Sequence, residues 1–300
     1  WWACWMGLYT EEKWADGFDR LLVWLLALAS GGLLVLFFAH IEVYAIFIAG
    51  LMSTFYFAYC YLQGKNGIVP VALSFGIAFL LHLSAGWLLP AFLLLPFFKK
   101  ENNHWFGDLI RFLEIFCLIQ GVFWSFLIIT FYDASLSRFL SRLHQDFYVG
   151  LDRSMFLPAW MWFNPWHLFD LLNVYLYYSV PCFLLIPFCL KQLRKPWTRE
   201  SGFWATSFMG FFIYSFFWNA DRGFPEDWDL FSPITLMAIF WVAHLLLPDR
   251  CESSDDSPES AELAEIHRSL IYLVSMGTLL FAWCQVYFHH IIPFIPPQFR

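Results

Sequence analysis

Apolar runs about as long as a membrane-spanning helix recur along almost the whole chain, and they constrain its fold more than any other feature. An α-helix needs about 20 apolar residues to cross the hydrocarbon core of a bilayer. Residues 1–8 resemble the end of a truncated helix, and longer runs follow at 21–39, 41–62, 68–82, 86–98, 109–131, 169–190, 202–218, 232–247 and 269–289. We therefore expect an all-α, polytopic transmembrane helix bundle of about nine spans.

The composition excludes a water-facing surface of the usual kind. Only 14% of the 300 residues are charged and 60% are hydrophobic, whereas soluble domains carry about 25% charged residues. The seven cysteines form no CxxC pair and lie mostly inside apolar runs, so they indicate neither a disulfide framework nor a metal site. The sequence also lacks the basic stripe that nucleic-acid binding requires, and no motif in it specifies a cofactor.

The apolar stretch that ends near Phe98 is too long for one span and carries polar residues at its middle. His82, Ser84 and Gly86 interrupt it. We expect a break there, so that 68–82 and 86–98 form a re-entrant or short helical pair.

The positions of Lys and Arg predict the orientation of the bundle, because these residues are enriched on the cytoplasmic side. With the break at His82, twelve of the 17 basic residues fall on one side: Lys13, Arg20, Lys65, Lys99, Lys100, Arg111, Lys191, Arg194, Lys195, Arg199, Arg250 and Arg268. We expect one transmembrane domain over residues 1–300, with external loops at 132–168 and 219–231 and an acidic cytoplasmic loop at 248–268.

The external side of this topology collects the polar residues that could carry chemistry. Glu42 stands at the junction of two apolar spans, where a carboxylate is costly unless it is paired or functional. The alternative is a residue placed favourably in the first turn of a helix. His82 could contact an anionic lipid headgroup, or it could be a histidine whose hydrogen bonds are satisfied inside a kink.

A second candidate group opens the span at 169–190. In Asn164-Pro165-Trp166-His167-Leu168-Phe169-Asp170, a helix would bring His167 and Asp170 onto neighbouring positions of one face. A carboxylate beside a histidine can support proton transfer or hold a ligand. The alternative is an N-terminal capping cluster behind Pro165.

The densest polar segment lies between residues 218 and 233. It places one arginine among acidic and aromatic residues, namely Asp221, Arg222, Asp227 and Asp229 with Trp218, Phe224 and Trp228. Arginine can bind phosphate oxygens with two hydrogen bonds, and aromatic rings can pack on sugars or lie at the headgroup level. The alternative is an interfacial loop with a local ion pair.

The order of these motifs resembles the GT-C type of membrane glycosyltransferases that use polyprenyl-phosphate sugars, especially the branch of protein O-mannosyltransferases and aminoarabinose transferases. Glu42 in His-Ile-Glu-Val-Tyr is similar to the second acidic position of that branch. The run from Leu73 through His82 to Pro90 is similar to its glycine-containing helix. Asn164 to His167 and Arg222 followed by 228–233 resemble its later external segments.

The resemblance implies transfer of a sugar from a polyprenyl-phosphate donor to an extracytoplasmic acceptor, in a bacterial inner membrane. It implies a catalytic role for Glu42 and donor binding by Arg222 and His82. The family's first external loop, with its acidic base, would precede residue 1. Two alternatives stay open: a non-catalytic scaffold or accessory subunit of a larger membrane complex, and a transporter or flippase of lipid-linked substrates.

Overall fold

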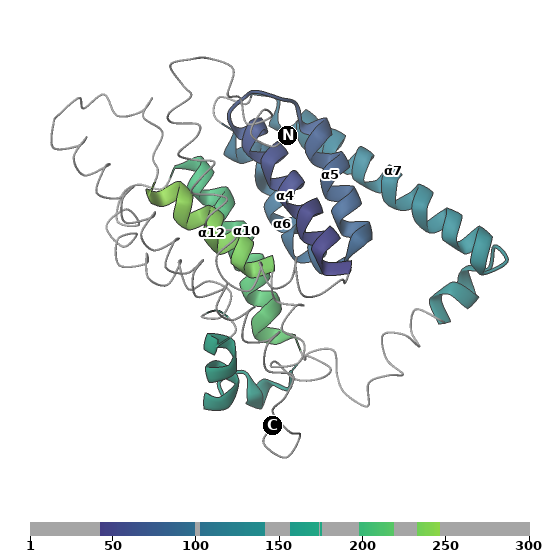
Figure 1. Ribbon diagram of the computed structural model, residues 1–300. Helices are drawn as coiled ribbons and strands as arrows, with labels where there is room; N and C mark the ends of the chain where they lie inside the picture. Colours follow the sequence, from purple (N-terminus) through teal and green to yellow (C-terminus); the bar gives the residue numbers. More distant parts are fainter. Residues whose placement is uncertain are drawn as a thin grey trace, which may run out of the picture. The chain divides into compact units, whose positions relative to one another are not determined.

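The structure, a computed structural model, describes residues 43–99, 103–141, 157–173, 175, 198–218 and 233–246 (Figure 1). Every regular element in these ranges is a helix, as the apolar runs predict. The chain divides into two compact units. The first comprises Trp1–Ile41, Tyr175–Pro196 and Thr235–Arg300, and the second comprises Glu42–Val174 and Trp197–Ile234. Of the first unit, the description covers Tyr175 and most of α12 (Pro233–Leu246), a helix predicted at 232–247.

Among the described residues of the second unit, five longer helices form a bundle, beside the shorter helical segments 136–141 and 165–173. The five longer helices are α4 (Val43–Leu62), α5 (Ile68–Leu81), α6 (Leu89–Phe98), α7 (Trp105–Phe131) and α10 (Arg199–Phe217). The predicted spans 41–62, 68–82, 86–98, 109–131 and 202–218 are thus confirmed as helices, with ends shifted by a few residues. Figure 1 shows α4, α5 and α6 side by side, and α5 also packs against α7.

The predicted break at His82 is confirmed. The α5 helix ends at Leu81, where His82 adopts an extended conformation with φ −158° and ψ 126°, and the 3₁₀-helix η2 (Leu83–Leu88) leads into α6. With 14 residues, α5 is only about 21 Å long, which is less than the hydrocarbon core of about 30 Å. The pair α5 and α6 is therefore short, as the sequence indicates.

Aromatic rings form the core of this unit. Phe75 stacks on Phe92 with ring centroids 4.5 Å apart, and Phe203 of α10 meets Phe92 edge-to-face at 5.5 Å. Phe55 lies 5.6 Å from Trp204. Such ring pairs add about 0.5–1.5 kcal/mol each beyond the burial of their area. Aromatic packing therefore joins helices that are far apart in the sequence.

Among the described residues, α7 is the one helix that is both long and apolar enough to cross a membrane. It has 27 residues, and only 6% of its most apolar window is buried. Leu118, Val122 and Ile129 are each more than 60% exposed. An apolar face of this length is unfavourable in water, so α7 indicates membrane association.

Close helix contact at glycines gives a first prediction. A Cβ on Gly210 would lie 2.2 Å from the carbonyl oxygen of Trp87, which is a backbone atom that cannot rotate away. We expect Gly210→Ala to destabilise the protein by about 1–3 kcal/mol through overpacking. Gly121 on α7 is the control because nothing lies within 4 Å of its Cβ position. Gly121→Ala should be neutral or stabilising by up to about 1 kcal/mol.

The measurement is thermal unfolding of the detergent-solubilised full chain. Equal unfolding midpoints for the two alanine variants would contradict the close approach of α10 to η2.

Candidate functional site

The structure describes three of the predicted site residues: His82, His167 and Asp170. The others, Glu42, Asp221, Arg222, Asp227 and Asp229, lie outside the described residues, so their roles stay predictions. The described three belong to the second unit.

His82 joins two helical segments. Its Nδ1 accepts a hydrogen bond from the backbone N–H of Ser84 at 3.2 Å and lies 2.7 Å from the hydroxyl oxygen of the same serine. The imidazole ring also packs on Phe47 of α4, with centroids 5.1 Å apart. His82 therefore caps the N-terminus of η2, which is the role of a satisfied histidine in a kink. A contact with a lipid headgroup stays a prediction.

His167 attaches a short helix to α10. Residues 165–173 are helical, and the side chain of Asn164 caps this helix by accepting a hydrogen bond from Trp166 N–H at 3.0 Å. His167 is 5% exposed, and its Nε2 lies 3.0 Å from the carbonyl oxygen of Phe216 in α10. Since a carbonyl only accepts, Nε2 carries the proton of the neutral ring. The hydrogen bond to Asn164 confirms the alternative interpretation of this segment as the N-terminal cap of a helix.

Burial is the main influence on the charge of His167. Removal from water lowers the pKa of its imidazole, while the bond to the Phe216 carbonyl and the nearby carboxylate of Asp170 act in the opposite direction. The neutral form is thus favoured. It donates one hydrogen bond from Nε2, which leaves Nδ1 as the nitrogen able to accept a proton.

A polar network at the other end of the bundle was missed by the sequence analysis. The buried hydroxyl of Tyr61 donates to Asp108 Oδ2 at 2.5 Å, and the ammonium of Lys99 lies 4.4 Å from the centre of the Tyr61 ring. Gln63 donates to Glu200 at 2.7 Å. These bonds connect α4 with α6, α7 and α10. A tyrosine and a glutamine at the end of an apolar run were the only sequence signal.

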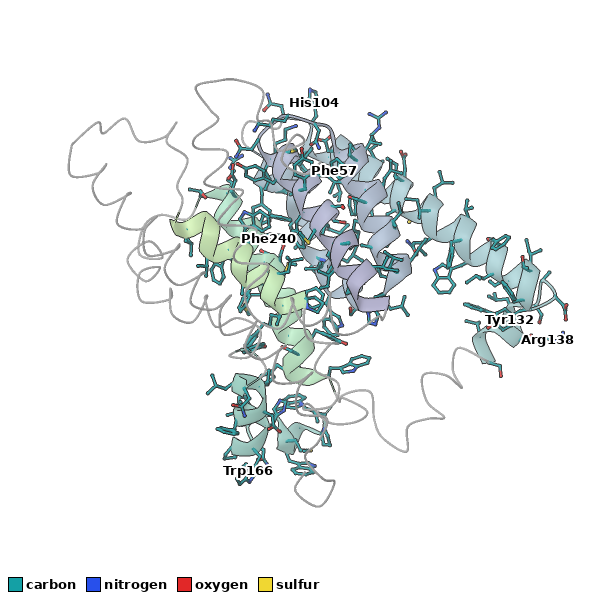
Figure 2. The ribbon with its side chains drawn as sticks, viewed as in Figure 1. Phe57, His104, Tyr132, Arg138, Trp166 and Phe240 are labelled. Atoms are coloured by element: carbon teal, nitrogen blue, oxygen red, sulfur yellow. The ribbon has the colours of Figure 1, made fainter. Side chains whose placement is uncertain are left out.

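Most of the described basic residues of this unit lie at one of its ends, beside the carboxylates of Asp108, Glu114 and Glu200. Lys65, Lys99, Arg111 and Arg199 lie near the helix ends that contain the Tyr61 network, and we call this the basic end. Arg199 donates to the backbone oxygen of Lys99 at 3.1 Å. His82 and His167 lie away from it, since Trp87 of η2 packs on Tyr214 and His167 bonds to Phe216. Figure 2 shows His104, near the basic end, and Trp166 at opposite ends of the view.

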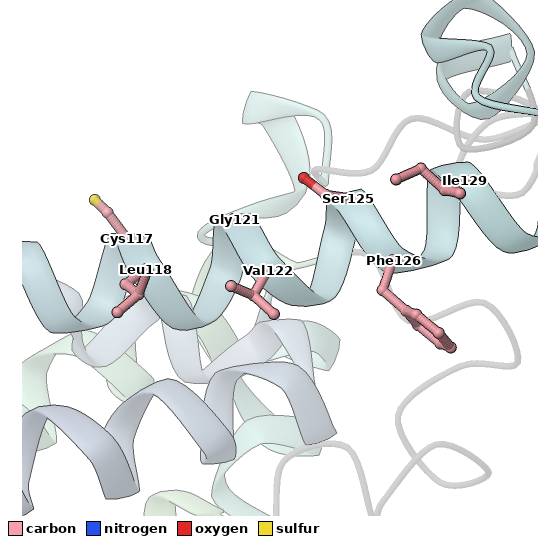
Figure 3. A pocket seen from close by; sticks show the side chains of 7 residues that line it. All are labelled: Cys117, Leu118, Gly121, Val122, Ser125, Phe126 and Ile129. Carbon is pink, nitrogen blue, oxygen red and sulfur yellow. The ribbon is translucent and has the colours of Figure 1, made fainter.

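Two open depressions lie on α7. One is apolar, has a volume of about 570 Å³ and follows a single helix face, as Figure 3 shows; its lining residues are Cys117, Leu118, Gly121, Val122, Ser125, Phe126 and Ile129. The other, of about 440 Å³, lies at the basic end beside Asp108, Arg111 and Glu114. In the part of the chain that the structure describes, no group of three or more His, Cys, Asp or Glu is placed to hold a metal ion.

Comparison with models of protein families, with curated proteins and with solved structures found no match to this chain.

The Tyr61 network gives a second prediction. Asp108→Ala removes the acceptor of a buried hydroxyl, which should cost about 1–3 kcal/mol of folding stability. Asp108→Asn keeps an acceptor oxygen and should cost less. Glu114→Ala is the control because Glu114 is an exposed carboxylate on the same helix, and it should change stability by less than about 0.5 kcal/mol. Chemical denaturation in detergent measures these differences, and equal losses for Asp108→Ala and Glu114→Ala would refute the network.

The buried His167 gives a pH prediction. Its pKa is lowered in the fold, so below the ordinary histidine range the unfolded chain binds a proton that the folded chain does not. The contribution of His167 to stability is therefore complete above the ordinary histidine pKa of about 6.5 and is lost as the pH falls below it.

His167→Gln retains an N–H donor but does not titrate. We expect the unfolding midpoint to fall less between pH 7.5 and 5.5 in this variant than in the wild type, and parallel pH profiles would count against the assignment.

Proposed function

We propose that the chain is an integral membrane protein with the activity of a GT-C type glycosyltransferase. It would move a sugar from a polyprenyl-phosphate donor to an acceptor on the extracytoplasmic side of a bacterial inner membrane. The observation that carries this proposal is the polarity of the second unit. Of its five described basic residues, Lys65, Lys99, Arg111 and Arg199 lie at one end, and Arg138 follows the other end of α7. The His82 turn and the His167 helix lie away from the basic end.

The charge distribution supports the orientation. Lys and Arg are enriched at cytoplasmic helix ends, so the basic end would face the cytoplasm. The His82 turn and the aromatic helix behind Pro165 would then approach the outer leaflet. These are two of the segments on which the resemblance to the glycosyltransferases rests, and Glu42 directly precedes α4 in the sequence.

In the proposed mechanism, the residues divide the work of an inverting transfer. A general base activates the acceptor near the anomeric carbon, and the carboxylate of Glu42 lies beside it and contacts the acceptor. Arg222, with His82, holds the phosphate of the donor and stabilises the negative charge that develops as the polyprenyl phosphate departs. Asp221, Asp227, Asp229, His167 and Asp170 line the approach of the sugar and lipid.

A second candidate is an accessory subunit of a membrane complex. Two observations favour it. His82 and His167 each make a hydrogen bond that stabilises the fold, and the apolar face of α7 is open along seven residues that could contact another membrane helix.

The test is a transfer assay with the full chain in membranes, supplied with a panel of polyprenyl-phosphate sugars. Glu42→Gln and Arg222→Ala should each lower turnover by about 100-fold or more, as expected for groups that act in the transition state. Glu114→Gln and Arg138→Ala are matched controls, because both side chains are exposed on the surface of the described bundle. They should retain wild-type turnover.

Wild-type turnover in both Glu42→Gln and Arg222→Ala would remove the site assignment. Absence of transfer with every donor, in a chain that is correctly inserted, would favour the accessory subunit.

A further inference from the structure

Residues 157–173, which we call the aromatic segment, expose unusually large apolar side chains. Trp160, Phe163 and Trp166 are 74%, 75% and 76% exposed, and Phe169 is 55% exposed. Asp170 is the only residue of the segment with a formal charge. Scattered exposed apolar residues are ordinary, but four large rings in so short a segment mark a surface that is covered by something other than water.

The segment is fixed to α10 by its polar groups. Leu157 N–H donates to the carbonyl oxygen of Phe217 at 2.9 Å, and His167 bonds to the adjacent carbonyl of Phe216. Trp162 turns inward, where its Nε1 donates to the carbonyl oxygen of Leu157 at 2.8 Å and its ring packs edge-to-face on Phe217 at 4.7 Å. The position of the segment relative to α10 is therefore set by specific bonds rather than by loose apolar contact.

The helix at 165–173 exposes its large apolar side chains, which is the opposite of what a surface helix of a soluble protein does. Its buried positions are His167 and Leu171, whereas Trp166, Phe169 and Leu172 are exposed at a spacing of three residues, along one helix face. A surface helix in water turns its apolar face to the core. Here the apolar face points outward, which fits a surround of lipid.

The length of α10 places the segment at a definite distance from the basic end. Arg199 begins α10 and bonds to Lys99, and the 19 residues of the helix rise about 29 Å to Phe217. The hydrocarbon core of a bilayer is about 30 Å thick. If the basic end marks one headgroup layer, the aromatic segment reaches the other, where tryptophan rings are enriched in membrane proteins.

We propose that the aromatic segment lies in the outer headgroup layer, with Trp160, Trp166 and Phe169 inserted among phospholipid headgroups and the first carbons of their chains. The partner is the lipid surface itself. The segment has no Lys or Arg, so it binds zwitterionic lipid without a requirement for anionic headgroups. This inference uses only the membrane insertion in the proposed function and is independent of glycosyl transfer.

The test uses the unmodified full chain in phosphatidylcholine nanodiscs that contain a photoactivatable phospholipid. One probe carries its diazirine at the headgroup and the other at the end of an acyl chain, and mass spectrometry locates the labelled residues. We expect the headgroup probe to label Trp160, Trp166 and Phe169 at least about tenfold more than Trp162, whose ring packs on Phe217 and is less exposed. The acyl-chain probe should label the α7 face from Leu118 to Ile129.

The outcomes separate this inference from the proposed function. Labelling of α7 without labelling of the aromatic segment overturns the inference, leaves membrane insertion intact and indicates that protein covers the segment. Labelling of the segment without α7 overturns the placement in the outer headgroup layer, because that placement rests on membrane insertion, and it removes the transmembrane helix. If neither the aromatic segment nor α7 is labelled, both the inference and the membrane insertion are overturned.

A pair of variants tests whether the rings themselves hold the segment at the interface. Trp166→Glu should reduce headgroup-probe labelling of Trp160 and Phe169 severalfold while α7 labelling is unchanged, because a charge opposes insertion of this face. Asn173→Glu introduces the same charge at an exposed polar position of the same helix and should have little effect. Equal labelling in both variants and the wild type would show that the rings do not determine the position of the segment.

Discussion

The second unit depends on one constraint: a backbone N–H or C=O group that is removed from water needs a hydrogen-bond partner. Helices meet this requirement along most of the described chain, and the interruption at His82 meets it locally. His82 N–H bonds to the carbonyl of Ala78, and Ala85 N–H bonds to that of His82. The imidazole accepts from Ser84 N–H. The polar residues at this point of the apolar run thus supply partners for backbone groups that the break would otherwise leave without hydrogen bonds.

Side chains hold the two ends and the middle of this unit in different ways. In the middle, rings of Phe75, Phe92 and Phe203 join α5, α6 and α10. At the basic end, Tyr61 bonds to Asp108. At the other end, a histidine bonds to a main-chain carbonyl. In the membrane location that we propose, lipid tails would offer helices no hydrophobic gain from association, so packing and hydrogen bonds of this kind would supply specificity.

The sequence predicted the helices better than their contacts. The apolar runs predicted α4, α5, α6, α7 and α10. His82, Ser84 and Gly86 predicted the break between α5 and α6. The predicted start of α10 was three residues late because an apolar run excludes the polar first turn, which Thr198 caps by accepting from Ser201 N–H at 3.1 Å. The first turn of α7 was missed because Gly107 and the charged Asp108 interrupt the apolar run after Trp105 and Phe106.

Candidate site residues were harder to predict because their partners are distant in the chain. No local pattern connects His167 with the carbonyl of Phe216, 49 positions away, or Tyr61 with Asp108, 47 positions away. The sequence identified His82 and His167 as unusual, and the structure adds that both stabilise helix junctions. The close approach of Gly210 to the carbonyl of Trp87 has a mechanical consequence. A residue larger than glycine would hold the two backbones apart, so the main chain rather than side chains sets the distance between α10 and η2 at this point.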